Sequence, residues 1–191
     1  METEMTEKES LELISKMINT AKSQIDKGSA FFFLLWGYLV VAASLLHYSL
    51  CVFWNLWKYA PYAWFLMFIG AIISIPYSFQ MRRKQKITTY AGRIVGYLWL
   101  GYGISICLLF LAKGFGVYYT PVILLFVAFA IFIAGITFKF KPLIIGAIIC
   151  WICAAITFRF QAMEQLLINA FAITAGYIIP GHLIYWKKDV K

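Results

Sequence analysis

Six long apolar runs without a formal charge limit this chain's possible folds more than any other feature. They cover residues 30–50, 60–79, 94–112, 120–138, 142–158 and 166–186, and none contains Asp, Glu, Lys or Arg. A bilayer core of about 30 Å needs about 20 apolar helical residues to cross it. Apolar residues make up 63% of the chain, against roughly 45–50% in a soluble domain. We therefore expect an all-α, polytopic transmembrane bundle of six helices over residues 30–186.

The basic residues predict how the bundle is oriented. Fourteen of the 17 Lys and Arg residues fall in the N-terminal segment, the MRRKQK loop with Arg93, the KFK turn and the short tail 187–191. The other side has only Lys58, Lys113 and Arg159. Cytoplasmic loops of membrane proteins carry the excess of Lys and Arg. Six crossings place both termini on one side, and we expect that side to be the cytoplasm.

The polar segment 1–29 precedes the first run and contains no apolar core of a signal peptide. Its apolar residues are spaced by three and four, which places them on one stripe of an amphipathic helix; they are Leu11, Ile14, Ile18, Ala21 and Ile25. We expect Gly28 and Ser29 to end this cytoplasmic helix. Two roles stay open: the helix lies on the membrane or the bundle, or Leu11, Ile14, Ile18 and Ile25 dock a cytoplasmic protein or a second copy.

Small residues four apart predict close contacts between the membrane helices, since lipid supplies no hydrophobic drive for helix association. The expected small-residue positions are Gly92 and Gly96, Ala130 and Ala134, Gly146, Cys150 and Ala154, and Ala172 and Gly176. Asn169 is costly to expose to lipid, so we expect it to face another helix.

Residues for catalysis or metal binding are scarce. Proton-coupled carriers commonly use ionisable residues in the membrane, and membrane hydrolases need a nucleophile with a base, or a metal. We expect His47 near the outer end of the first run and His182 near the inner end of the last run, so the two are not expected to share a metal. Cys150 and Cys153 have no second ligand pair. We expect no enzyme activity and no cofactor, and the spread of basic residues over loops argues against nucleic acid as a partner.

The last run is interrupted by Pro180, Gly181 and His182. Proline lacks an N–H and clashes with the preceding helical turn, and we expect Gly176 to reduce crowding there and Thr174 or a water to supply a hydrogen bond. The simpler interpretation is a bend that ends or redirects the helix. The alternative is a site at the cytoplasmic end, where His182 senses pH or binds a ligand.

The stretches LLWGYLVVAASLLHY and IIPGHLIYWKK resemble a largely uncharacterised family of small six-span bacterial inner-membrane proteins. That resemblance extends over nearly the whole chain and implies a bacterial plasma membrane. It implies no catalytic residue.

Two functions follow as hypotheses. The first is a non-enzymatic integral membrane protein that acts by association with a partner or with itself. The second is a small carrier or channel for a neutral or apolar solute. A membrane enzyme is the weakest of the possibilities.

The orientation can be tested by cysteine labelling. In a chain whose four native cysteines are replaced by alanine, Lys84→Cys should react with a membrane-impermeant maleimide only when the cytoplasmic face is exposed. Lys58→Cys, on the opposite side, should react on intact cells. Labelling of Lys84→Cys on intact cells would contradict the predicted orientation.

Overall fold

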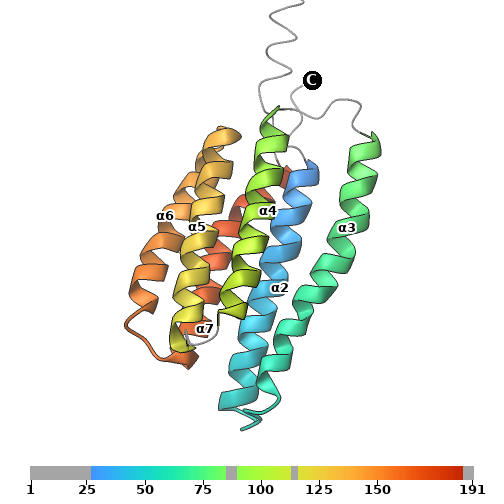
Figure 1. Ribbon diagram of the computed structural model, residues 1–191. Helices are drawn as coiled ribbons and strands as arrows, with labels where there is room; N and C mark the ends of the chain where they lie inside the picture. Colours follow the sequence, from blue (N-terminus) through green and yellow to red (C-terminus); the bar gives the residue numbers. More distant parts are fainter. Residues whose placement is uncertain (1–26, 85–89, 113–115, 187–191) are drawn as a thin grey trace, which may run out of the picture.

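The computed structural model describes residues 27–84, 90–112 and 116–186, which are largely helical and contain no strand (Figure 1). Five helices are long and apolar enough to cross a membrane; they cover residues 28–52, 60–81, 92–111, 116–137 and 162–186. A shorter apolar helix covers Lys141–Thr157. The chain is therefore a helical, multi-pass membrane protein. The amphipathic stripe of Leu11, Ile14, Ile18 and Ile25 and the basic tail lie outside the described residues.

The helices follow the predicted runs closely. The long ones are α2 (Lys27–Val52), α3 (Leu66–Lys84), α4 (Tyr90–Leu111), α5 (Tyr119–Thr137) and α6 (Lys141–Thr157). Short 3₁₀ turns, Ala60–Phe65 and Gly116–Tyr118, lead into α3 and α5. The last run consists of α7 (Ala162–Ile173), a π-helical turn η3 (Thr174–Ile178) and α8 (Ile179–Trp186). Gly28 and Ser29 lie in the first turn of α2, and the amphipathic helix that they were expected to end lies outside the described residues.

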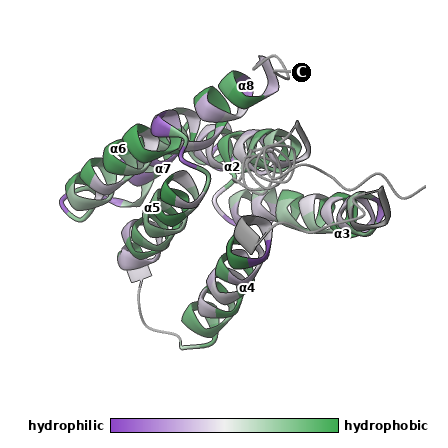
Figure 2. Cartoon of the chain, turned by 90° about the horizontal axis from the view of Figure 1, so that it is seen from above, coloured by the Kyte–Doolittle hydropathy of each residue, from purple (hydrophilic) through white to green (hydrophobic). Residues whose placement is uncertain are grey.

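The helices form a packed centre with two outlying members. Helices α5 and α6 make a hairpin, and the α7–α8 run packs between α6 and α2. Seen from above, α3 and α4 extend from the centre as separate arms (Figure 2), with α3 against α2 and α4 against α5. Only 11% of the α3 and α4 spans is buried, against 56% of the last span. Two helices therefore expose most of their surface.

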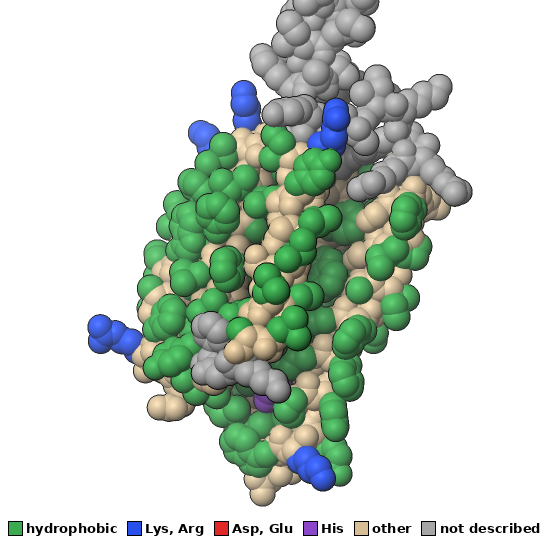
Figure 3. Space-filling view, in the orientation of Figure 1, with side chains coloured by type: hydrophobic (Ala, Val, Ile, Leu, Met, Phe, Trp, Pro, Cys, Tyr) green, Lys and Arg blue, Asp and Glu red, His purple; other side chains and the backbone are tan. Residues whose placement is uncertain are grey.

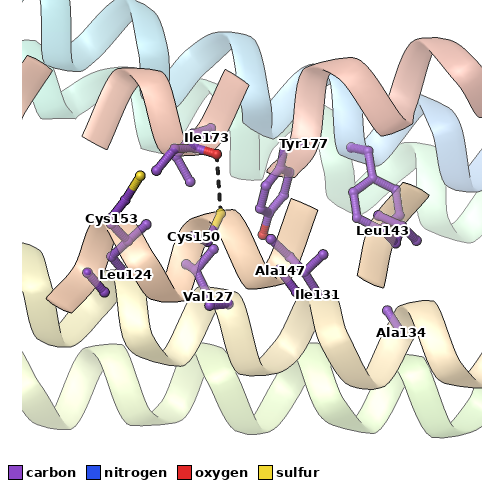
Figure 4. Packing of buried hydrophobic residues seen from close by; sticks show 14 of the residues in the cluster. Leu124, Val127, Ile131, Ala134, Leu143, Ala147, Cys150, Cys153, Ile173 and Tyr177 are labelled. Atoms are coloured by element: carbon purple, nitrogen blue, oxygen red, sulfur yellow. Dashed lines mark hydrogen bonds between the residues drawn. The ribbon is translucent and has the colours of Figure 1, made fainter. Parts of the chain in front are cut away.

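The centre is held by small residues that let backbones approach closely. Gly146, Cys150 and Ala154 are buried on α6, and Ala130 and Ala134 are buried on α5. These small-residue predictions are confirmed. Leucine and isoleucine side chains with no exposed surface fill the remaining space in this core (Figure 4).

The tightest approach joins α6 to the π turn. A Cβ atom at position 146 would lie 2.9 Å from both the carbonyl oxygen of Ala175 and the Cα of Gly176. A Cβ at position 176 would lie 2.6 Å from the Cys150 sulfur. At position 146 backbone atoms leave no room for a methyl group, whereas at position 176 the side chains of Cys150 and Ile131 occupy that space.

Gly96 departs from the prediction. A Cβ added at Gly96 would meet no atom within 4 Å, and the same holds for Gly101 and Gly103 on the same helix. The expected packing role of Gly96 is therefore wrong within this bundle, because α4 stands apart from the other helices on that side.

A few buried hydrogen bonds join the helices. The Asn169 side-chain amide donates to the Ser44 hydroxyl at 3.0 Å, and both residues are buried. This bond joins α7 to α2 and confirms that Asn169 faces another helix. Near the other end of α7, the Gln165 amide donates to the carbonyl of Phe160 at 2.9 Å and stabilises the turn that enters this helix.

Charged side chains avoid the middle of the described bundle. On the face drawn in Figure 3, the Lys and Arg side chains lie toward its two ends, and a largely hydrophobic surface separates them. This distribution matches a bilayer, in which a buried formal charge is costly.

Replacing Gly146 by alanine should destabilise the bundle. The added methyl group meets backbone atoms that cannot rotate away, so we expect a loss near the upper end for overpacking, about 3 kcal/mol. Gly101→Ala is the matched control and should leave stability unchanged or slightly raised, because nothing lies within 4 Å. Unfolding in SDS-containing mixed micelles measures both; equal stability of the two variants would contradict the packing argument.

Candidate functional site

The interrupted last helix contains the candidate site, and its central feature is the π turn. The N–H of Ile179 donates to the carbonyl of Thr174, five residues earlier. Such turns are rare and often occur at functional positions. The turn is followed directly by α8, whose second residue is Pro180.

The helix continues through Pro180 to Trp186, so of the two outcomes expected for this bend, an end or a change of direction, the end does not occur. A proline ring in an α-helix clashes with the carbonyl one turn earlier, and a local π adjustment relieves such clashes in membrane helices. The Thr174 hydroxyl donates to the carbonyl of Ala170 at 2.8 Å. Thr174 therefore does not supply the hydrogen bond expected near Gly176.

Glycines bring this segment against α2. A Cβ at Gly181 would lie 2.9 Å from Leu34, and a Cβ at Gly37 would lie 3.0 Å from the Cβ of Tyr177. Gly176 faces α6, as described above, so the π turn is enclosed by α2 and α6. Gly176 and Gly181 thus allow close packing on two sides of the last helix, against α6 and α2 respectively.

His182 is paired with a residue of the first helix. A hydrogen bond of 2.8 Å joins its Nε2 to the Tyr38 hydroxyl, which donates when the ring proton is on Nδ1. The His182 ring also stacks on Trp186, with ring centroids 5.2 Å apart. His182 is half-buried and Tyr38 is half-exposed. The structure therefore combines Tyr38, His182 and Trp186 into one cluster, about 6 Å before the end of α8 by helical rise.

Tyr38 belongs to this site although the sequence alone did not indicate it. A phenol in the middle of an apolar run is the signal that could have identified it, because a Tyr hydroxyl away from water usually needs a partner. Nothing in the sequence indicated that this partner would be His182, which lies 144 positions away.

The second histidine belongs to another part of the molecule. His47 Nδ1 accepts a hydrogen bond from the Trp64 indole at 3.0 Å, which joins α2 to the turn before α3. His47 and His182 thus have separate aromatic partners. Each ring has a structural explanation.

The two cysteines of α6 are buried in the core. The Cys150 thiol donates to the carbonyl of Ala172 at 3.2 Å, and Cys153 lies one turn further along (Figure 4). Cys150 thus forms part of the α6–α7 contact. In the part of the chain that the structure describes, no group of three or more His, Cys, Asp or Glu residues could hold a metal ion.

The chemistry available to the Tyr38–His182 pair is limited. Nucleophilic catalysis uses a nucleophile, a base and a group that orients the base. The described residues place a phenol and an indole beside the imidazole, and this arrangement is typical of a hydrogen-bonded helix contact. Comparisons of the chain with protein-family models, with curated proteins and with solved structures gave no match.

The two histidine contacts can be separated by NMR of the ¹⁵N-histidine-labelled protein. Tyr38→Phe should move the ring-nitrogen signals of His182 and leave those of His47 in place, because it removes one hydrogen-bond partner. Trp64→Phe should do the reverse. Each variant should lose about 1 kcal/mol of stability. If neither histidine responds to its partner's substitution, these two bonds do not exist in the protein.

Proposed function

We propose that the chain is a six-span, non-enzymatic membrane protein that acts by association within the bilayer, with a second copy or another membrane protein. In this proposal the shorter helix α6 also crosses the membrane and brings the number of crossings from five to six. Its 17 residues extend about 26 Å at 1.5 Å per residue, which meets the lower limit of roughly 17 residues for a span. Lys141 and Arg159 flank it at opposite ends.

The proposed membrane is the bacterial plasma membrane, with both termini in the cytoplasm. The family resemblance supports the membrane, and the excess of Lys and Arg on one side supports the orientation. The N-terminal segment then lies in the cytoplasm, where its Leu11, Ile14, Ile18 and Ile25 stripe offers a second contact for a partner.

The open glycine face of α4 is the observation that carries the proposal of association. Gly96 and Gly103 are seven residues apart and therefore share one side of the helix, and neither has an atom within 4 Å of an added Cβ. Leu100, on the same side, is 59% exposed. In the rest of the bundle Gly37, Gly70, Gly135, Gly146, Gly176 and Gly181 each meet another residue at 3.0 Å or less.

A glycine in a helix costs about 1 kcal/mol relative to alanine. At Gly146 and Gly176 close packing offsets this cost. At Gly96 and Gly103 of α4 no packing within the bundle offsets it. Small residues on an exposed membrane helix suit a second helix. The filled core of α5, α6 and α7, where Leu124, Ile131 and Leu143 have no exposed surface, supports association over solute transport.

Cys107 permits a direct test on the native chain. It is exposed on the same side as Gly103, four residues further on, whereas Cys51, Cys150 and Cys153 are buried. If two copies meet through α4, mild oxidation of native membranes with copper–phenanthroline should form a disulfide-linked dimer, and Cys107→Ala should abolish it. Gly103→Ile should reduce the yield about tenfold, corresponding to about 1.4 kcal/mol of association energy.

Gly101→Ile is the matched control for that experiment. Gly101 also has nothing within 4 Å, but it lies on a different side of α4, so this variant should retain the dimer. A partner of another kind should appear when native-membrane particles are sized without detergent. Particles that contain one chain alone, unaffected by Gly103→Ile, would overturn the proposed association.

A further inference from the structure

The turn between α2 and α3 exposes an unusual number of aromatic rings. We call residues 53–65 the aromatic tip. Six of its side chains are more than half exposed: Phe53, Trp54, Trp57, Tyr59, Tyr62 and Phe65. An exposed apolar surface of this kind marks an interaction site.

Hydrogen bonds within the turn fix the conformation of the aromatic tip. The N–H of Leu56 donates to the carbonyl of Leu50 at 2.8 Å, and the Trp57 indole donates to the Asn55 side chain at 2.7 Å. Asn55 has a φ of 54°, a conformation in which Asn is enriched. Ala60 and Ala63 of the same turn are buried, and the turn packs against α2. The fold therefore holds these side chains outward.

The rings continue into the lipid-facing surface of α3. Tyr59, Tyr62, Phe65 and Phe68 recur every third residue, and neighbouring centroids lie 6.3, 5.5 and 5.8 Å apart. Beyond Phe68, the exposed row goes on through Ile72 and Phe79 on the same span. The aromatic tip is thus continuous with the membrane-facing surface of the protein.

Helix lengths place the aromatic tip at the edge of the bilayer. At 1.5 Å per residue, the 26 residues of α2 extend about 39 Å and the 17 of α6 about 26 Å. Figure 1 shows the α2–α3 end reaching past the ends of α5 and α6 on that side. A hydrocarbon core of about 30 Å is bordered on each side by a polar headgroup layer. With the hydrocarbon core centred on the shorter helices, the aromatic tip falls at the level of this layer.

We propose that the aromatic tip is a lipid-docking surface that inserts into the headgroup–acyl boundary of the adjoining leaflet and binds glycerophospholipids. Trp and Tyr favour this zone because their rings are apolar and their N–H and O–H groups can meet polar partners. Lys58 is the only charged residue in the aromatic tip. Its long apolar stem can lie along the rings while its ammonium group meets a lipid phosphate. The docking anchors the α2–α3 hairpin independently of contacts through α4.

The depth of the aromatic tip can be measured on the full chain labelled with 5-fluorotryptophan. Its seven Trp residues give separate ¹⁹F signals, and Trp54→Phe and Trp57→Phe assign two of them. In phosphatidylcholine–phosphatidylglycerol nanodiscs, a phospholipid with a nitroxide near its glycerol should abolish the Trp54 and Trp57 signals. Trp99, which packs against Phe33 and Tyr177, should keep its signal.

A water-soluble gadolinium chelate gives the opposing measurement. The proposal expects the Trp54 and Trp57 signals to persist with the chelate or to weaken less than with the lipid nitroxide. If both signals persist with the lipid nitroxide, the proposal is overturned. Their loss to the chelate alone would then identify a surface in water for a soluble partner, and their persistence with both reagents would show that protein covers the aromatic tip.

Discussion

The close approach of α6 to the π turn, through Gly146 and Gly176, is the contact on which the rest of the bundle depends. In lipid, helices gain little from burying apolar surface against one another, so van der Waals packing and buried hydrogen bonds must hold them together. This contact brings two backbones together, and the Cys150–Ala172 and Asn169–Ser44 bonds lie close to it along the last helix. With α6 and α2 on its two sides, the last helix becomes the centre of the molecule.

The same packing explains how a proline is tolerated inside the last helix of the bundle. The π turn precedes Pro180, and the helix continues beyond it, so that Gly181 meets Leu34 and His182 reaches Tyr38. The segment that interrupts the apolar pattern of the sequence is the segment through which α8 contacts α2. The joining groups are a phenol and an imidazole.

The periphery follows a different rule from the centre. Helices α3 and α4 leave most of their surface to the surroundings, so their residues report what lies outside the bundle. The open glycines of α4 favour contact with a further helix. The aromatic rings before α3 favour a position at the polar boundary of the bilayer. One exposed surface thus suits protein and the other suits lipid, and the difference follows from side-chain size and polarity.

The sequence by itself determined that this chain is a helical membrane protein and which residues form its helices, because uncharged apolar runs of this length have few other stable arrangements. It also indicated that Gly146, Cys150 and Asn169 would meet other helices. Only the tertiary structure decided that Tyr38 pairs with His182, that a π turn precedes Pro180, and that Gly96, Gly101 and Gly103 of α4 stay open. Helical periodicity reports which side of one helix is unusual, whereas the choice of neighbour depends on how all helices pack together.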